Sequence, residues 1–467
     1  MEREIRLMEM PAYDKALFNE CVKQLNNSRE PNREALEYYE GKHQSDDVQI
    51  STPQRMRHLK TVTGWPGTIV DCIDERLDFE GWLADDDGFL NRVYAANHLD
   101  TEASQVHLDA LIYGVSFAAV SPGGRNEPHP LVVGLSAKHT TGIWNPRTRL
   151  LSAALTVTKK SDETTPIECL FWTPTHRWYC YRDSDGHIYA EGEPHGLGRV
   201  PVVAFPNRPR TSREFGRSEI TRAIRYYTDA AQRTLLGMEI NREFYNTPQR
   251  VGLNMPEDAF DGPDGVQPWT SVMGQVWMLP PDPNGGKDSH PPSMQQFPPS
   301  SPKPYVDQVR EYQALVAAEA GVPEAYLGLN TENPSSADAI RALESRLVKR
   351  VERRQATFGR GWLEVAALCE AITGREADPM VTVEWGDPST PTRAATADAV
   401  SKLVGAGILP ADSDVTLNML GLTAQERELV RADLDRAENR ALAAEIAALP
   451  ALPTNPFLLE VQRGSDG

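Results

Sequence analysis

The chain has 467 residues, of which 40% are hydrophobic and 24% charged, and its formal net charge at pH 7 is -18. This length predicts two or three domains, or one extended subunit whose regions pack on neighbours, and the composition is that of a globular protein rather than a fibrous or disordered one. A net negative surface repels phosphates, which excludes tight nucleic-acid binding over the whole surface and leaves only local or weak contacts.

The cysteines and the hydrophobic pattern indicate in which cellular compartment the protein is made. The five cysteines are odd in number, scattered and never spaced as C-x-x-C, so we expect no disulfide framework and no cysteine-rich zinc site, and a reducing compartment fits best. The N-terminal residues lack the uninterrupted apolar region of a secretory signal, and no stretch approaches the roughly 18 to 20 apolar residues that span a bilayer. We therefore expect a protein that is soluble and cytosolic where it is made.

Hydrophobic periodicity predicts three helices before residue 118. They span residues 1–40, with Pro31 as an early helical position, residues 60–78 and residues 89–118. The chain then changes to short runs rich in Val, Thr, Tyr and Trp that are separated by turn residues, which predicts a β-rich module at about 115–205.

Two helices flank a proline-rich insertion in the middle of the chain. The first helix, at about 218–246, would be a rod about 40 Å long, and the second is predicted at about 305–320. The insertion between them, residues 251–303, has little helical character. Because so long an insertion is unusual inside a compact domain, we expect it to make its contacts elsewhere.

The segment NPSSADAIRALESRLVKRVERRQ, which starts at Asn333, opens the longest predicted helix. Apolar residues recur at helical spacing from Ile340 to Ile372, and a strand is predicted at 381–387 before a net acidic helical region. Six basic residues stand close together in this helix against two glutamates: Arg341, Arg346, Lys349, Arg350, Arg353 and Arg354. The residues alone leave three interpretations open, namely a solvated face with local ion pairs, phosphate contact, or salt bridges between subunits.

The search for catalytic motifs is mostly negative. The sequence has no P-loop, H-E-x-x-H, G-x-S-x-G or dinucleotide G-x-G-x-x-G motif. Residues 300–303 match S-x-x-K formally, but Pro302 and Pro304 deny them the helix that would aim Lys303 at Ser300.

Metal ligation is also disfavoured. The triple aspartate 85–87 suggests a calcium or two-metal nuclease site, but Phe89 occupies the next ligand position and no acidic residue follows at the twelfth, so a solvated turn is favoured. His98 and His107 lie nine residues apart and do not face together on a helix, so core or surface roles are favoured over ligation. We expect no enzymatic activity, no cofactor and no metal.

Seven blocks stand out between Tyr38 and about Gly386. They are YYEGKH (38–43), VDCIDERLDFEGW (70–82), NHLD with HLDALIYGVSF (97–117), FGRSEI (215–220), NTPQR (246–250), VPEAYLG (322–328) and the long basic segment (333–362). In this order they resemble the portal proteins of tailed bacteriophages of the siphophage type, particularly those of phages infecting actinobacteria.

The resemblance implies a mainly helical α+β portal fold with wing, stem, clip and crown. Such subunits form a ring, typically of twelve copies, around a central channel at one capsid vertex, where double-stranded DNA enters during packaging and leaves during ejection. Transferred to this chain, the parts are the wing at 1–215 and 335–386, the stem helices at 216–248 and 304–321, the clip at 249–303, the tunnel loop at 329–336, the crown at 387–448 and a flexible tail at 449–467.

The resemblance also implies partners and a location. The expected partners are identical subunits, double-stranded DNA bound without sequence specificity, the large terminase packaging motor, a head-completion (adaptor) protein, and the major capsid and scaffolding proteins, with no membrane. The expected location is the portal vertex of the virion, and the host cytoplasm during assembly.

Three sets of site residues follow for a DNA channel. We expect weak DNA contact from short polar residues of the tunnel loop, since many Lys or Arg contacts would slow sliding; they are Asn330, Thr331, Asn333, Ser335 and Ser336. We expect the basic helix to pair with neighbouring subunits through Arg346, Lys349, Arg350 and Arg353, and the clip to dock partners through Trp269, Val276 and Trp277. The alternatives are a DNA-processing enzyme with an acidic metal site, and a capsid-associated interaction protein without a channel.

Overall fold

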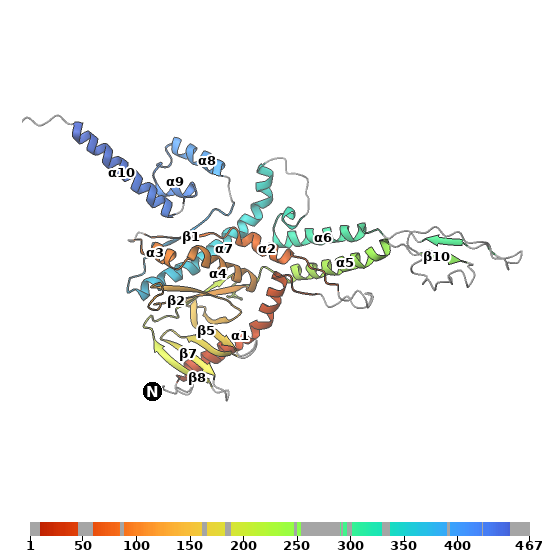
Figure 1. Cartoon of the computed structure of the whole chain (residues 1–467). Helices are drawn as coiled ribbons and strands as arrows, with labels where there is room; N and C mark the ends of the chain where they lie inside the picture. Colours follow the sequence, from red (N-terminus) through yellow and green to blue (C-terminus); the bar gives the residue numbers. More distant parts are fainter. Residues whose placement is uncertain are drawn as a thin grey trace, which may run out of the picture. The chain divides into compact units, whose positions relative to one another are not determined.

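The computed structural model of the chain is α+β and about half helical (Figure 1). It describes residues 10–44, 59–84, 88–160, 166–182, 188–246, 250–253, 290, 293–296, 301–328, 337–389, 393–422 and 424–448. The chain divides into two compact units, Met1–Ser389 and Thr390–Gly467.

The N-terminal part of the first unit contains more breaks than the periodicity predicts. Its elements are α1 (Ala12–Tyr39), α2 (Trp65–Asp74), β1 (Phe79–Leu83), α3 (Phe89–Ala96) and α4 (Leu99–Tyr113). The single helix expected at 89–118 is wrong, because His98 adopts a left-handed φ of 51° that separates α3 from α4, and the chain is extended from Val115. Pro31 lies inside α1 rather than near a helix start; it removes one helical hydrogen bond without ending the helix.

The expected β-rich module is confirmed as two antiparallel sheets. A three-stranded sheet has the order β3 (Leu131–Leu135), β2 (Val115–Ser121), β9 (Val202–Pro206). A five-stranded meander follows chain order and contains β4 (Thr140–Asn145), β5 (Leu150–Lys160), β6 (Pro166–Trp172), β7 (His176–Arg182) and β8 (Ile188–Pro194).

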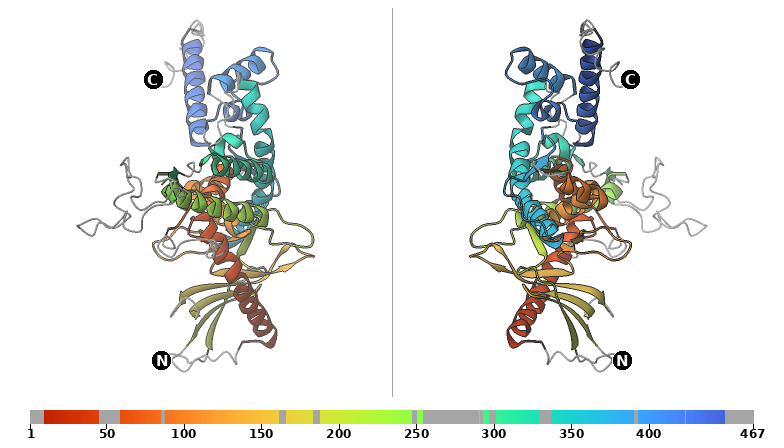
Figure 2. Two further views of the ribbon diagram at one scale, coloured as in Figure 1. Left: turned by 90° about the vertical axis from the view of Figure 1, so that its right-hand side faces the viewer. Right: turned by 90° about the vertical axis from the view of Figure 1, so that its left-hand side faces the viewer.

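Helix α1 packs on the five-stranded sheet (Figure 2). Phe18 of α1 meets Phe171 of β6 edge to face, with 5.4 Å between the ring centroids, and both belong to one buried hydrophobic cluster. The helix thus covers a sheet face that would otherwise be left apolar and exposed.

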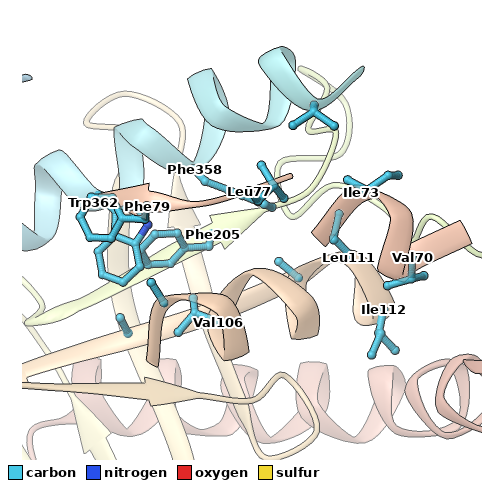
Figure 3. Packing of buried hydrophobic residues seen from close by; sticks show 14 of the residues in the cluster. Val70, Ile73, Leu77, Phe79, Val106, Leu111, Ile112, Phe205, Phe358 and Trp362 are labelled. Atoms are coloured by element: carbon cyan, nitrogen blue, oxygen red, sulfur yellow. The ribbon is translucent and has the colours of Figure 1, made fainter. Parts of the chain in front are cut away.

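The main core of the first unit forms around helix α7 (Ala337–Ile372), which packs against α2, β2, β9 and β12 (Thr382–Trp385). Strand β12 pairs antiparallel with β1. Phe79 of β1 stacks on Trp362 of α7 with centroids 4.6 Å apart, and Phe205 of β9 packs 4.8 Å from the same indole (Figure 3). These aromatic rings join segments almost 300 residues apart in the chain.

His107 is a core residue. It is fully buried, its ring stacks on Phe358 with centroids 5.1 Å apart, and its Nε2 accepts a hydrogen bond of 2.9 Å from Trp362 Nε1. Burial lowers the pKa of His107 to about 3, so the imidazole is neutral at physiological pH and acts as an acceptor.

Helices α5 (Arg222–Asn246) and α6 (Lys303–Ala320) pack along each other in opposite directions (Figure 1). At one end of the pair the Thr221 hydroxyl donates to Glu319 at 3.2 Å, further along Tyr227 stacks on Tyr312, and a Cβ on Gly237 would meet the Tyr305 ring at 3.2 Å. Within the insertion that joins the two helices, the structure describes the antiparallel pair β10 (Arg250–Leu253) and β11 (Ser293–Gln296).

The second unit is helical, with α8 (Arg393–Gly405), α9 (Asp414–Met419) and α10 (Ala424–Ala448). Ser413 caps α9 by accepting a hydrogen bond from the Thr416 amide at 3.2 Å. Several large apolar side chains of this unit are exposed, among them Leu429 at 64% and Ile408 at 66%.

Two further expectations concern cysteines and membranes. All five cysteines are buried free thiols, in line with the expected lack of a disulfide framework. Among the described residues, no helix combines the length and apolar character needed to cross a bilayer.

Candidate functional site

The charged centre of the first unit is Glu219, in the loop that joins β9 to α5. Its side chain is fully buried. Arg350 Nη2 lies 2.7 Å from Oε2, Arg354 Nε donates to Oε1 at 3.1 Å and its Nη2 contacts the same oxygen, and Arg208 Nη1 lies 3.6 Å from Oε2. Asn207 Nδ2 also donates to Oε1 at 3.0 Å. One carboxylate is therefore shared by three guanidinium groups and an amide.

In the block FGRSEI, the backbone at Gly216 passes very close to the backbone at Asn207, and this close approach positions the loop that carries Glu219. Gly216 has φ +68°, and a Cβ there would lie 1.9 Å from the Asn207 carbonyl oxygen, so only glycine fits this position. Asn207 clamps the loop because its carbonyl accepts from the Arg217 amide at 2.8 Å and its side chain donates to the Arg217 carbonyl at 2.8 Å. The Glu219 amide then donates to the Leu111 carbonyl at 2.9 Å, which fixes the loop on α4.

Helix α7 presents its arginines to two other helices. Arg350 and Arg354 are one turn apart and reach Glu219 beside the start of α5. Arg346 Nη1 donates to the Ala318 carbonyl at 3.0 Å, and Arg350 Nη1 donates to the Glu319 carbonyl at 3.3 Å. These carbonyls belong to the last turn of α6, where helical acceptors lack partners and cations are stabilised. The basic segment therefore joins α7 to both α5 and α6 within one chain.

The pKa values of the buried carboxylate and of two arginines reflect burial and the close approach of these charged groups. Burial alone would raise the pKa of Glu219, but the Arg354 and Arg350 guanidiniums outweigh burial, and the pKa lies below its usual range. Burial lowers the pKa of Arg350 despite the Glu219 charge, and burial together with Arg208 lowers the pKa of Arg217. Burial is the main cause of both arginine shifts, and neighbouring guanidiniums add to it because cationic side chains gather here in excess over carboxylates.

This excess lines a cavity of about 760 Å³, which we call the basic pocket. Of its eleven lining residues, eight are cationic, and Pro209, Ala356 and Thr357 complete the wall. The cationic residues are Arg208, Arg210, Arg217, Arg346, Lys349, Arg350, Arg353 and Arg354. Arg208 has a left-handed φ of 52°, which costs a non-glycine residue free energy and is typical of functional sites.

The structure brings all four predicted intersubunit residues to this pocket. Arg346 and Arg350 have the intrachain partners described above, and Lys349 Nζ contacts Glu352 at 2.5 Å. The Arg353 side chain is exposed and forms no ion pair with the part of the chain that the structure describes. Their role between subunits stays a prediction.

Other predicted site residues lie outside the described residues. This applies to the tunnel loop residues Asn330, Thr331, Asn333, Ser335 and Ser336, to the clip residues Trp269, Val276 and Trp277, to the triple aspartate at 85–87 and to the tail at 449–467. Among the residues that are described, no group of three or more His, Cys, Asp or Glu side chains is placed to hold a metal ion.

Sequence reasoning missed Glu219 and the loop arginines Arg208, Arg210 and Arg217. The block FGRSEI is one of the seven blocks that carry the family resemblance, and its isolated glutamate just before a helix is the available signal. The partners Arg350 and Arg354 lie more than 130 residues further on, so no local pattern connects them with Glu219.

Comparisons with known proteins identify a family. A family model described as phage portal protein, SPP1 Gp6-like, matches residues 19–431. The portal protein of Mycobacterium phage D29 is 32% identical over 434 residues, which cover 88% of this chain and 87% of that protein, and the portal protein of Mycobacterium phage L5 is 33% identical over 419 residues, covering 84% and 83%. Among solved structures, a chain from the neck of an empty gene transfer agent (GTA) particle is similar with a TM-score of 0.44 at 13% identity, covering 79% of this chain and 92% of that one.

Proposed function

The chain belongs to the SPP1 Gp6-like phage portal protein family, and we propose how its parts perform the role of a portal at one capsid vertex. Identical subunits join head to tail into a ring of twelve, because a heterologous contact that closes by rotation generates a ring. The ring encloses a channel for double-stranded DNA during packaging and ejection. It also docks the large terminase motor and later the head-completion protein.

We assign the parts as follows. The antiparallel helices α5 and α6 form the stem, and the insertion at 249–303 forms the clip that meets partners. The β-rich module with α7 forms the wing, and the second unit forms the crown. The joint between α5, α6 and α7 is the observation that supports this assignment most directly. It anchors one end of a two-helix stalk through Glu219 and Arg350, while the other end leads into the insertion.

The channel is proposed to contact DNA weakly. With a net charge of -18, the subunit repels phosphates at long range, and the polar tunnel loop at 329–336 offers hydrogen bonds without cations. DNA then passes without sequence reading and without the tight phosphate binding that would slow it.

Negative-stain microscopy of the purified full chain tests this function, together with a DNA-cleavage assay with Mg²⁺ on the same sample. Rings with a central hole and no cleavage are expected. Monomers at micromolar concentration would argue against the ring, and metal-dependent cleavage by those monomers would favour the nuclease alternative.

A further inference from the structure

The basic pocket holds more positive charge than the described carboxylates around it neutralise. Glu219 is the buried carboxylate that meets Arg350 and Arg354, and Glu352 contacts Lys349 at the rim. Eight cationic side chains line the cavity, so most of their charge has no carboxylate partner there. Placing like charges together costs free energy unless an anion binds, and the pocket is therefore built to receive one.

An adjoining hollow indicates that the anion is part of a protein surface. A second cavity of about 690 Å³ shares Pro209, Arg210, Ala356 and Thr357 with the basic pocket. Its wall is largely apolar and includes Trp144, Leu151 and Val203. An apolar surface with polar and charged groups at its rim is typical of protein interfaces, whereas the phosphates and sugars of a duplex backbone offer little apolar surface to fill such a hollow.

The same subunit carries a group of carboxylates that we call the acidic edge, formed by Asp71, Asp74, Glu75, Asp78 and Asp387. The Gly386 amide donates to the Asp78 carbonyl at 2.9 Å, which brings Asp387 beside α2 and β1. Glu75 and Asp78 are exposed and form no ion pair within the described residues. Burial, with smaller contributions from the neighbouring Asp71, Asp78 and Glu75 carboxylates, raises the pKa of Asp74 to about 6.

The basic pocket and the acidic edge lie on opposite sides of α7. Glu344 contacts Arg76, which follows α2, at 3.6 Å. Gln355 donates to the Gly386 carbonyl at 3.0 Å, so Glu344 and Gln355 lie on the side of α7 that faces the acidic edge. Arg353 follows Glu344 by nine residues, which is two and a half turns and places it on the opposite side. Oppositely charged surfaces on opposite sides suit a head-to-tail contact between copies.

We propose that the basic pocket of one subunit receives the acidic edge of the next subunit in the ring, with Arg353 facing Glu75 and Asp78 of a second copy of this chain. The inference rests on the proposed ring. It gives the basic helix a double role. Arg350 and Arg354 hold the stem to the wing inside a subunit, while Arg353 is left for the neighbour.

Charge reversal of the full chain tests the proposal. Arg353→Glu and Asp78→Arg should each reduce the ring fraction, measured by size-exclusion chromatography and negative stain, by at least about tenfold, since like charges would then meet at every interface. The double variant Arg353→Glu with Asp78→Arg should recover most of the rings. Arg125→Glu makes the same charge change at an exposed loop residue and should assemble as wild type does. Thermal unfolding of the unassembled fraction checks that each variant folds, and Glu75→Arg replaces Asp78→Arg if that variant does not.

The possible outcomes distinguish failure of the proposed contact from failure of the proposed ring. If wild type forms no rings, the proposed function fails. If wild type forms rings and Arg353→Glu does so equally well, the proposed contact is wrong. Loss of rings in both single variants without recovery in the double variant also contradicts the pairing. Normal rings of Arg353→Glu that bind a short DNA duplex more weakly than wild type would assign the pocket to nucleic acid instead.

Discussion

At the scale of single residues, Glu219 shows how a buried charge fixes two segments, α7 and the loop before α5, against each other. A buried ion pair is weak evidence for net stability, because desolvation offsets much of the attraction. Its value here is geometric, since the carboxylate can satisfy Arg350, Arg354 and Asn207 only when α7 and the loop before α5 are correctly placed.

We expect Glu219→Gln to lower the free energy of unfolding by about 3–5 kcal/mol, because it leaves buried guanidiniums without their counter-charge. Chemical denaturation measures the change, with an unchanged slope showing that the folded state keeps its compactness. Glu352→Gln removes an exposed partner of Lys349 and should cost less than about 1 kcal/mol. Equal effects of the two substitutions would show that burial of the Glu219 contacts is unimportant.

His107 predicts a pH dependence of stability. Burial lowers its pKa from the ordinary 6.5 to about 3, so the unfolded chain binds a proton below pH 6.5 that the folded chain binds only near pH 3. This contribution to stability is fully present above pH 6.5 and is lost as pH falls toward 3.

We therefore expect His107→Gln to have a flatter pH profile than wild type. Between pH 7 and 5 the gap in unfolding free energy between the two proteins should narrow by about 2 kcal/mol, as measured by urea denaturation at each pH. The substitution His129→Gln changes an exposed histidine and should follow the wild-type profile. Parallel profiles for His107→Gln and wild type would mean that the imidazole is not held neutral by burial.

At the scale of elements, the sequence predicted the long regular pieces and missed the interruptions. The helices α5, α6 and α7 were predicted because a single apolar stripe persists over many turns. The breaks at His98 and the strand β1 were missed, because a left-handed residue and a five-residue strand leave too few residues to establish a period. The arginines of the candidate site were visible as a cluster, but their partner Glu219 was not, since the pairing is set by tertiary packing.

The loop between β9 and α5 depends on glycine at Gly216. Gly216→Ala should lower the free energy of unfolding by at least about 2 kcal/mol more than Gly374→Ala does. Both glycines have positive φ, +68° at Gly216 and +75° at Gly374. At Gly374 nothing lies within 4 Å of an added Cβ, so only the left-handed backbone is penalised, by about 1–2 kcal/mol. At Gly216 the Asn207 carbonyl must also move, which loosens the loop that carries Glu219. Thermal or urea unfolding of both variants measures the difference, and equal costs would show that the close approach relaxes easily.

At the scale of the whole molecule, the two compact units differ in how much of their apolar surface they bury. The three buried hydrophobic clusters of the described residues lie entirely within residues 10–385. The second unit buries few large side chains, chiefly Val400 and Leu417, and leaves Ile408, Leu429 and Leu442 exposed. Exposed large apolar side chains are typical of segments that complete their core on a neighbour, which suits the proposed crown formed by many copies.

We therefore expect a chain truncated after Ser389 to fold cooperatively, with an unfolding midpoint within about 5 °C of the full chain, because the core that determines its stability is retained. Residues 390–467 alone should show at most partial helicity by circular dichroism and no cooperative transition, since isolated helices without tertiary packing are marginal in water. A cooperative transition of the isolated second unit would show that it has a sufficient core of its own. Loss of cooperative unfolding in the truncated chain would show that the first unit depends on the second, and the division into a self-sufficient wing and stem with a dependent crown would then be wrong.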